Sequence, residues 1–548
     1  MRSLPRAAAA AFVLVSLWAP RAAGQARFAD PAAWQADLAV LATELPRLHP
    51  DLFRRLTAAQ WDSAVRALSA RLGDLSDRQA YVAFQQLVAL VGDGHTSLNP
   101  LFERTFPLRY YPVELALFDD GLFVKSAAPE YRDLVGARVV RLGRVTAEAA
   151  LAAAGTTISA DNEWWARTWA PGRLILPEVV AGLGLADDAD RLPLVVERAG
   201  RQESAVLRPA GPLPVAAHGP GGGVDRSGWI DMRGPGGTPP WLRAPDRPYA
   251  MEYLPESRTV YVAYRAVMDW PEEPNAAFWG RVFATVDSLH PERLVLDLRE
   301  NVGGNSFNNL RVIRGIVARP AIDQPGHLFA IIGPRTFSAA MNLANELERY
   351  TRVTFVGEPT GSSVQFFGDH VPLPLPRTGL AVNVSQLWWQ TLNPRDDRRF
   401  IAPARYTPMA AADYRDNRDP ALDAIAAGPA SPGIADIEAA VLAGDTTRAG
   451  AALDAARAAR INRYRNLEAE VNALGYRLLR GQRIEPAIVA FRLNAWAFPR
   501  SANVFDSLGE AYAAAGRRDE AIAAFRAALE RDPAFDSSRA WLERLGAR

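Results

Sequence analysis

Apolar residues in the first part of the chain recur at helical spacing. Between residues 31 and 91 they include Trp34, Leu38, Leu41 and Leu45. Apolar residues have the same helical spacing again just before the sequence GDG. Glycine favours the end of a helix, so GDG is expected to end the last of these helices. The sequence therefore predicts a helical segment over residues 27–104, with a loop or an incoming strand after GDG.

Two later stretches have the period-two alternation of strands. The runs PVELALF, GLFVKSA and ARVVRLG predict a small strand-rich module over residues 105–210. The runs TVYVAYR, RLVLDLR, HLFAIIG and VTFVG alternate with helical segments and predict an α/β core over residues 251–430. Residues 211–250 are dense in glycine and proline, so they are expected to form a loop or linker.

An internal repeat occupies the alanine-rich residues 431–548. Six positions recur at an offset of 34 residues: Val471, Leu474, Gly475, Ala487, Phe491 and Pro499, then Phe505, Leu508, Gly509, Ala521, Phe525 and Pro533. This period and pattern are typical of an all-α tetratricopeptide array of stacked antiparallel helix pairs. A helix pair near residues 435–460 and a terminal helix from Ser537 are expected to complete or cap it.

Charge and composition exclude several classes of function. The 548 residues include 62 basic and 61 acidic side chains, for a formal net charge of +1. Such a chain has no broad basic face, so no nucleic-acid partner is expected. The chain contains no cysteine, which excludes disulfides, thiolate metal sites and cysteine catalysis.

The first residues have the pattern of a secretory signal peptide. Arg2 and Arg6 precede an apolar stretch over residues 7–19, and small residues follow it. We expect cleavage to remove residues 1–26. A permanent anchor is disfavoured because the apolar run is too short to cross a bilayer. The mature chain is therefore expected to be exported to a bacterial periplasm or the extracellular space, without stable membrane insertion.

Three motifs far apart in the sequence offer the parts of a serine hydrolase. VGDGHTS contains His95, VLDLRENVGGN contains Gly303 and Gly304, and GPRTFSAAMN contains Ser338. A serine hydroxyl needs a base that takes its proton and backbone N–H groups aimed at the oxygen that becomes negative. The motifs supply a candidate for each need. The alternative for Ser338 is that it only caps the helix predicted to start there.

These motifs resemble the S41 peptidase family, which includes tail-specific (C-terminal processing) proteases, the tricorn protease core and interphotoreceptor retinoid-binding proteins. The resemblance covers roughly residues 28–428, with GDGHT, DLRENVGG, TFSAA and VGEPTG in the family's order. It implies a crotonase-like mixed α/β peptidase core, with the strand-rich module in the place of the family's PDZ-type insert. It also implies a serine peptidase that needs no metal and no organic cofactor.

The family divides over the base that activates the serine. One branch uses a lysine about two dozen residues after the serine, and the tricorn-like branch uses a histidine. Lys125 is the only lysine of this chain and lies in the strand-rich module. The resemblance therefore implies that His95 is the base, since an imidazole can take the serine proton and return it to the leaving amine. The alternative is a structural histidine at a helix end.

The resemblance also implies an acidic residue that orients the histidine. The corresponding stretch is NPRDDRRFIAP, in which Asp397 is the first candidate and Asp396 the second. The alternative for both is a solvated charge on a loop. Glu358 and Asp369 are held in reserve, and Thr96 is a candidate for a supporting hydroxyl.

The oxyanion hole is expected to use the backbone N–H of Ala339 with that of Gly303 or Gly304. Glycine is needed where a backbone approaches a ligand closely or takes a positive φ. The alternative is a plain turn after a strand, but a turn alone does not predict Asp297 and Arg299 before it. We expect these two residues to shape the loop by hydrogen bonds or an ion pair.

Other chemistries lack their motifs. No lysine follows a glycine-rich stretch as a phosphate loop requires, and there is neither an HExxH zinc pair nor a GxSxG elbow around Ser338. The sequence thus predicts an exported serine peptidase that acts on peptides or unfolded proteins, with a repeat surface for a protein partner. Two alternatives remain: a catalytically inactive ligand-binding module, and a scaffold in which the helical repeats carry the function.

Overall fold

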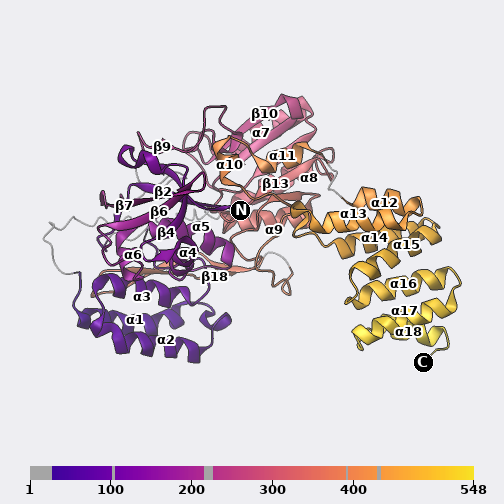
Figure 1. Ribbon diagram of the computed structural model, residues 1–548, viewed down its shortest axis with the longest axis horizontal. Coiled ribbons are helices and arrows are strands. Elements are labelled where there is room, and N and C mark those ends of the chain that lie inside the picture. Colours follow the sequence, from indigo (N-terminus) through magenta and orange to yellow (C-terminus); the bar gives the residue numbers. More distant parts are fainter. Residues whose placement is uncertain (1–27, 101–104, 215–225, 391–392, 429–432, 548) are drawn as a thin grey trace, which may run out of the picture.

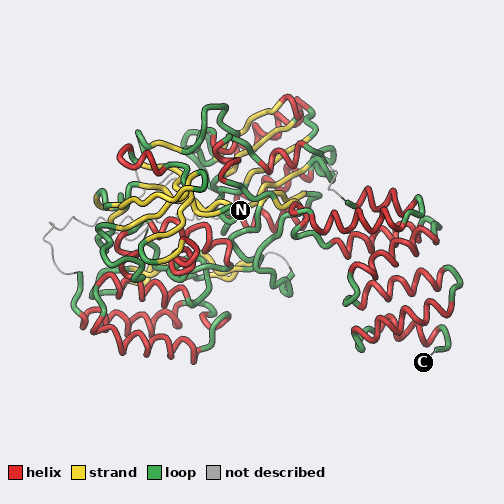
Figure 2. Tube along the Cα trace, viewed as in Figure 1, coloured by secondary structure: helices red, strands yellow, loops and turns green. Residues whose placement is uncertain are grey.

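The computed structural model describes residues 28–100, 105–214, 226–390, 393–428 and 433–547. The predicted signal peptide lies outside these residues. Three N-terminal helices and a C-terminal helical array stand on opposite sides of two larger sheets (Figure 1), and Figure 2 colours the helices and the strands in the same view. Within the described ranges, no helix combines the length and the apolar character needed to cross a membrane.

The N-terminal segment is helical, as its apolar spacing predicts. Its helices are α1 (Pro31–Leu48), α2 (Ala58–Arg71) and α3 (Asp77–Ala89). Each helix is capped by the side chain of the residue before it, which accepts a backbone N–H of the first turn. The apolar faces of these helices share one core with the ribbon β16 (Val371–Pro374) and β17 (Ala381–Val384). The loop after α3 is therefore held against residues that are distant in sequence.

The strand-rich module contains both strands and helices. Its sheet has the order β2-β3-β4-β6-β7, with β5 beside β4 and β9 beside β3. The strands of this sheet are β2 (Val113–Phe118), β3 (Gly121–Ala127), β4 (Arg138–Leu142), β5 (Val145–Thr146), β6 (Leu192–Arg198), β7 (Arg201–Leu207) and β9 (Ile230–Asp231). Strands β1 (Arg109–Tyr110) and β8 (Gly211–Pro212) form a separate two-stranded sheet. Its helices are α4 (Ala147–Gly155), α5 (Glu163–Leu174) and α6 (Pro177–Gly182).

The glycine- and proline-rich segment is more than a connection. Its strand β8 pairs with β1 and its strand β9 pairs with β3. Farther along, the N–H of Gly234 donates to the carbonyl of Arg415. The described parts of this segment therefore lie against the strand-rich module and the core, which composition alone did not predict.

The α/β core is built on a six-stranded sheet of order β10-β11-β12-β13-β14-β19. The strands are β10 (Tyr249–Leu254), β11 (Thr259–Tyr264), β12 (Arg293–Asp297), β13 (Leu328–Ile332), β14 (Thr354–Gly357) and β19 (Arg405–Tyr406). Strands β11, β12, β13, β14 and β19 run parallel, and within this sheet only β10 is antiparallel to its neighbour. Strands β15 (Phe366–Gly368) and β18 (Leu387–Trp389) form a separate ribbon.

Helices cover both faces of this sheet, so its strands are apolar on both sides. Helices α7 (Asn275–Leu289), α8 (Asn309–Val317) and α9 (Ala339–Tyr350) pack on the face that carries Val260, Val262, Leu294 and Leu296. Helix α11 (Pro420–Ala426), which follows the short α10 (Ala411–Arg415), packs on the opposite face. The motif residues follow β12 and β13 at the carboxyl edge of the parallel strands, where α/β folds place their sites.

The C-terminal residues form a stack of antiparallel helices. The helices are α12 (Ile434–Leu442), α13 (Thr446–Ala458), α14 (Leu467–Arg480), α15 (Ile484–Ala497), α16 (Ala502–Ala514), α17 (Arg518–Arg531) and α18 (Asp536–Arg544). The predicted helix pair and the predicted terminal helix are both present. The stack is joined to the rest of the chain by an ion pair between Arg460 and Asp119 and by Tyr464 against the ring of Tyr406.

Two glycines at equivalent repeat positions allow the helices of a pair to approach closely. A Cβ atom at Gly475 would lie 2.5 Å from the Phe491 ring, and one at Gly509 would lie 2.6 Å from the Phe525 ring. This contact explains why both glycines and both phenylalanines recur at the same offset. The repeat is thus a packing unit of one helix pair.

We expect Gly475→Ala to destabilise the helical array by about 1–3 kcal/mol, because the new methyl group overpacks against Phe491. Gly450 in α13 is a matched control, since no atom lies within 4 Å of a Cβ built there. Gly450→Ala should stabilise the same array by up to about 1 kcal/mol through helix propensity. Urea unfolding of the full chain, followed by circular dichroism, measures both changes. Equal effects of the two substitutions would contradict the packing argument.

Candidate active site

Ser338 sits on a sharp turn between β13 and α9. Its backbone has φ 54° and ψ −124°, a conformation that costs a residue with a side chain about 1–3 kcal/mol. The turn is fixed from outside: the Phe337 N–H donates to the Asn301 carbonyl, and the Thr336 hydroxyl donates to the Leu298 carbonyl. The nucleophile elbow of α/β-hydrolases is a comparable strained strand-to-helix turn. The GxSxG motif is absent here, so only the structure reveals the elbow.

The side chain of Ser338 does not cap its helix. Ser338 occupies the position before α9, yet its hydroxyl makes no capping hydrogen bond. The hydroxyl instead lies 2.9 Å from Nε2 of His95. The capping alternative is therefore wrong, and the predicted nucleophile and the predicted base are brought together from positions 243 residues apart.

The ring of His95 is clamped between two aromatic side chains. Phe337 stacks on it at a centroid distance of 4.5 Å, and Phe366 of β15 lies nearly parallel to it at 5.6 Å. Trp165 of α5 stacks on the outer side of Phe337 at 3.9 Å. A Cβ atom at Gly94 would lie only 2.7 Å from the Phe337 ring, so the glycine before His95 makes room for this stack. The clamp fixes the plane in which Nε2 meets the serine.

The glycine loop touches the serine directly. A Cβ atom at Gly303 would lie 2.6 Å from Cβ of Ser338, and both Gly303 and Gly304 have positive φ. The N–H of Gly303 donates to the side-chain oxygen of Asn301. The N–H groups of Gly304 and Ala339 are therefore the part of the predicted oxyanion set that remains free of that bond.

Asn301 organises this loop, although sequence reasoning did not single it out. Its buried side chain accepts from the N–H of Gly303 and donates to the Tyr264 carbonyl at the end of β11. The backbone carbonyl of Asn301 accepts a hydrogen bond from the backbone N–H of Phe337. The available signal was the asparagine between the strand and the two glycines of DLRENVGG, since buried polar side chains are almost always hydrogen-bonded.

The ion pair expected between Asp297 and Arg299 is present. Arg299 Nε donates to Asp297 at 3.0 Å, and the hydroxyl of Tyr261 donates to the same carboxylate at 2.5 Å. Arg299 also forms a fork to Asp419, the residue that caps α11. Burial raises the pKa of Asp297, and the Arg299 charge opposes that shift. These residues tie the glycine loop to the far face of the sheet.

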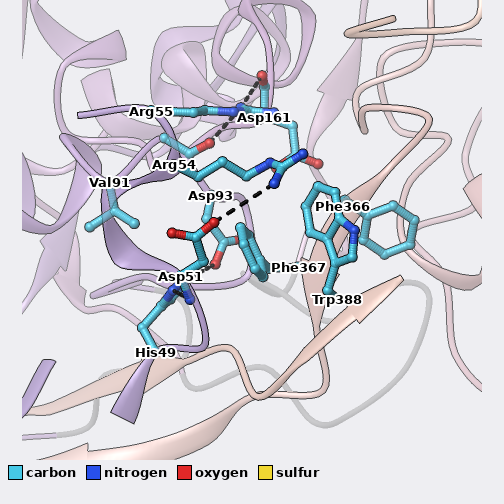
Figure 3. A pocket seen from close by; sticks show the side chains of 11 residues that line it. His49, Asp51, Arg54, Arg55, Val91, Asp93, Asp161, Phe366, Phe367 and Trp388 are labelled. Atoms are coloured by element: carbon cyan, nitrogen blue, oxygen red, sulfur yellow. Dashed lines mark hydrogen bonds and ion pairs between the residues drawn. The ribbon is translucent and has the colours of Figure 1, made fainter. Parts of the chain in front are cut away.

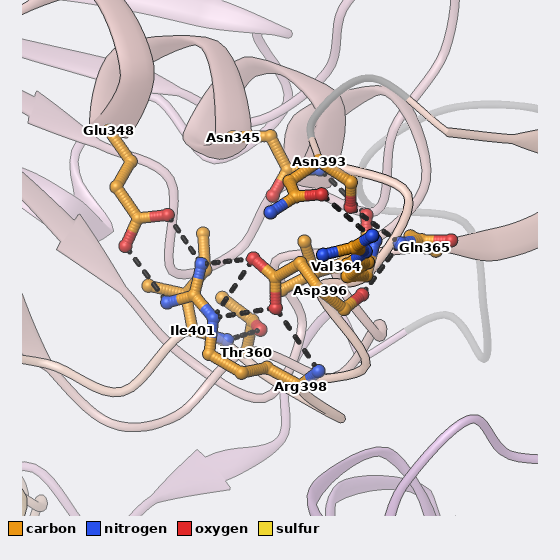
Figure 4. Close-up of polar contacts among 10 residues, drawn as sticks. Asn345, Glu348, Thr360, Val364, Gln365, Asn393, Asp396, Arg398 and Ile401 are labelled. Carbon is orange, nitrogen blue, oxygen red and sulfur yellow. Dashed lines mark hydrogen bonds and ion pairs between the residues drawn. The ribbon is translucent and has the colours of Figure 1, made fainter. Parts of the chain in front are cut away.

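The prediction that Asp397 orients His95 is wrong in this structure. Asp397 is exposed, and Nδ1 of His95 is buried without a hydrogen-bond partner among the described residues. Asp396 is directed elsewhere: its carboxylate accepts from Arg398, which also forms a fork to Glu348 on α9 (Figure 4). The guanidinium of Arg398 holds the pKa of Asp396 below its usual value.

The reserve candidates do not reach His95 either. Asp369 accepts from the indole N–H of Trp389 at the surface. Thr96 is fully buried, and its hydroxyl oxygen accepts from the N–H of Ser385 rather than bonding the serine or the histidine. Glu358 follows β14, and the charges that act on it do not include His95; they are those of Arg167, Asp119, Arg299 and Arg460. Thr96 therefore supports the histidine loop, and the described residues show no hydrogen bond between Glu358 and His95.

Glu358 predicts a pH dependence of stability. Burial raises its pKa from 4.5 to about 7. The folded state therefore keeps a proton that the unfolded state loses, so this residue's contribution to stability falls as pH rises from 4.5 towards 7. As pH rises from 4.5 towards 7, we expect the free energy of unfolding of Glu358→Gln to increase relative to that of the unsubstituted protein by about 1–3 kcal/mol. Urea unfolding of both proteins at pH 4.5, 6 and 8 measures the difference, and a constant difference would contradict it.

A buried pair of ionisable side chains that the sequence did not indicate lies beside the loop of His95. Asp93 and His49 form a buried pair at 3.1 Å, and both line a small cavity of about 10 Å³ together with Arg55 and Asp161 (Figure 3). A space of this size holds about one water molecule. Within the described residues, no group of three histidine, aspartate or glutamate side chains is arranged to hold a metal ion.

Comparison with solved structures establishes the fold. Mature CPAF complexed with lactacystin superposes with a TM-score of 0.51 at 12% identity, over 72% of this chain and 97% of CPAF. Mature CPAF alone gives the same score over 72% and 96%. The photosystem II D1 C-terminal processing protease is 14% identical over 72% and 96%, with a TM-score of 0.34 that is too low to establish a shared fold. No family model and no curated protein sequence matches the chain. The predicted mixed α/β class with a C-terminal helical stretch is confirmed.

Proposed function

We propose that this chain is a serine peptidase of the S41 type, with Ser338 as nucleophile and His95 as base. The observation that carries the proposal is the 2.9 Å contact between Ser338 Oγ and His95 Nε2, made by a serine held in a strained elbow. A serine that only supported the fold would not need this backbone conformation. The motif order of the family and the fold shared with mature CPAF support the same conclusion.

In this mechanism each residue has one task. Ser338 Oγ attacks the scissile carbonyl carbon while its proton moves to His95 Nε2. The oxygen that becomes negative would be held by the N–H groups of Gly304 and Ala339, and the N-terminal end of α9 favours the same charge. His95 then protonates the leaving amine. A water molecule, deprotonated by His95, hydrolyses the acyl-enzyme and restores Ser338.

The surface beside the oxyanion loop supports a peptide with apolar side chains as substrate. Val302, which precedes Gly303, is 41% exposed, and Phe307 in the next turn is 85% exposed. Exposed apolar side chains beside the reactive groups can pack against apolar side chains of a peptide, which removes apolar surface from water on both sides. We therefore assign extended or unfolded polypeptide as the substrate class.

Export and the repeat surface complete the proposal. The N-terminal residues have a signal-peptide pattern, so the mature enzyme would act in a periplasm or outside the cell. The C-terminal helix pairs would act as tetratricopeptide repeats that bind a protein partner or a polypeptide being delivered. Fractionation of the expressing cells tests the first statement, and deletion of residues 433–548 tests the second by loss of partner capture with retained peptidase activity.

Labelling with a fluorophosphonate probe tests the catalytic proposal without a known substrate. The purified mature protein is treated with the probe, and the modified residue is mapped by mass spectrometry. We expect an adduct on Ser338 that is absent from Ser338→Ala and sharply reduced in His95→Ala. Absence of an adduct on folded protein would overturn the catalytic function and favour a ligand-binding or scaffold role.

A further inference from the structure

The positive charge that His95 gains when it takes a proton has no partner at Nδ1. Nε2 faces the hydroxyl of Ser338, so it must be the unprotonated nitrogen if it is to take the serine proton. Nδ1 then carries the resting proton, and it has no hydrogen-bond acceptor within the described residues. When the proton arrives, the imidazolium cannot be stabilised by a carboxylate bonded to Nδ1. The compensating charge must act from another direction.

Asp93 is the closest carboxylate along the chain and is built into the same loop. Its Oδ1 accepts from the backbone N–H of His95 at 2.9 Å, and its Oδ2 accepts from the hydroxyl of Ser385 at 2.6 Å. Burial alone would raise the pKa of Asp93, but hydrogen bonds from His49, Ser385 and Thr96 and the proximity of His95 hold it below the usual value. Asp93 is therefore a buried carboxylate that stays ionised.

His49 satisfies Asp93 without neutralising it. Nδ1 of His49 accepts from the backbone N–H of Asp51 at 3.1 Å, so this nitrogen carries no proton. The single ring proton is then on Nε2, which donates to Asp93 at 3.1 Å. A ring with one proton is neutral, and the pair therefore keeps the full negative charge of the carboxylate next to the His95 loop.

The other charged groups around His95 do not replace Asp93. Asp161 accepts from the N–H of Gly94, and burial together with the Asp93 charge raises its pKa, with Arg55 acting in the opposite direction. His370 also interacts with His95, and burial followed by the charge of His95 lowers its pKa. The surroundings thus lower the pKa of Asp93 and raise that of Asp161. Of these two buried carboxylates, Asp93 is the one favoured as an anion.

We propose that Asp93 is a positioning residue whose buried negative charge, oriented by His49, Ser385 and Thr96, stabilises the imidazolium of His95 during proton transfer. It replaces in this chain the orienting carboxylate that was expected at Asp397. The inference rests on the proposed function, since it concerns the base of that reaction. It differs from a hydrogen-bonded triad because the charge reaches His95 through space and through its backbone N–H.

The test compares Asp93→Asn with the unsubstituted protein as a function of pH. The rate of fluorophosphonate labelling of Ser338 is measured between pH 5 and 9. We expect the plateau rate to fall by about tenfold to a hundredfold, because the imidazolium loses its counter-charge. The acidic limb of the curve of labelling rate against pH should also move to lower pH by about half a unit to one unit, since a proton on His95 becomes less favourable. Asp93→Glu should restore the position of the limb.

Matched controls separate charge from structure. Asp397→Asn makes the same chemical change at the surface and should leave both the rate and the limb unchanged. A lower rate with an unmoved limb, or no change of rate, would overturn the inference. Asp93→Ser is the second neutral variant if asparagine prevents folding, with the same criteria. If unsubstituted protein is not labelled, the proposed function fails, and an NMR titration of His95 in the same variants still tests the charge: an unmoved midpoint overturns the inference.

Discussion

The double variant Ser338→Ala/His95→Ala is expected to be as active as either single variant. Each single substitution should lower kcat by about 10,000-fold or more, since the two residues act as a unit. In the proposed mechanism, His95 acts only by taking and returning the proton of Ser338 across their 2.9 Å contact. In a protein without the Ser338 hydroxyl, the loss of His95 should therefore not lower kcat further. Steady-state hydrolysis of a denatured protein substrate by the four proteins measures the effect.

Stability measurements provide the control for this cycle. Ser338→Gly should also abolish activity, yet it should stabilise the fold by about 1 kcal/mol because glycine accepts φ 54° without strain. Inactivity combined with higher stability would exclude misfolding as the cause. Additive losses of activity in the double variant would instead mean that Ser338 and His95 act in separate steps, and the proposed pair would have to be abandoned.

The sequence was sufficient to predict that Ser338 and His95 meet, but not the way in which they are held. The motifs place the glycine loop and Ser338 after predicted strands, whose carboxyl ends meet at one edge of a parallel sheet. His95 follows a predicted helix instead, and the resemblance to the family is what pairs it with Ser338. The elbow was not predictable, because backbone φ depends on the bonds of Thr336 and Phe337 to loops that come earlier in the chain. The aromatic clamp joins Phe337 and Phe366 to a histidine from a distant loop.

The acidic residue shows why a motif alone misleads. The motif predicts Asp397 from its place before an apolar residue and a proline, but the neighbouring Arg398 holds that loop against Glu348 by a fork. Asp93 lies inside GDGHT, a pattern that predicts only a helix-ending turn. Its partners His49 and Ser385 are 44 and 292 residues away in sequence. Burial and long-range hydrogen bonds, which no local pattern records, make it an ionised carboxylate.

Gly303→Ala is expected to lower kcat by about a hundredfold to a thousandfold with little change in KM. The added Cβ would lie 2.6 Å from Cβ of Ser338 and 3.0 Å from the N–H nitrogen of Ala339, at a backbone φ of 113° that suits glycine. The loop must therefore move away from the serine and take the N–H of Gly304 with it. An oxyanion donor acts mainly in the transition state, so its displacement lowers kcat rather than substrate binding.

Gly200 provides the matched control for Gly303. It also has a positive φ, 76°, but no atom lies within 4 Å of a Cβ built there, in the turn between β6 and β7. Gly200→Ala therefore has the backbone strain without the collision, and it should cost about 1 kcal/mol of stability and no activity. Equal kcat values for Gly303→Ala and Gly200→Ala would show that the glycine loop is only a turn. A loss confined to Gly303→Ala, with the fold retained, would place the oxyanion at this loop.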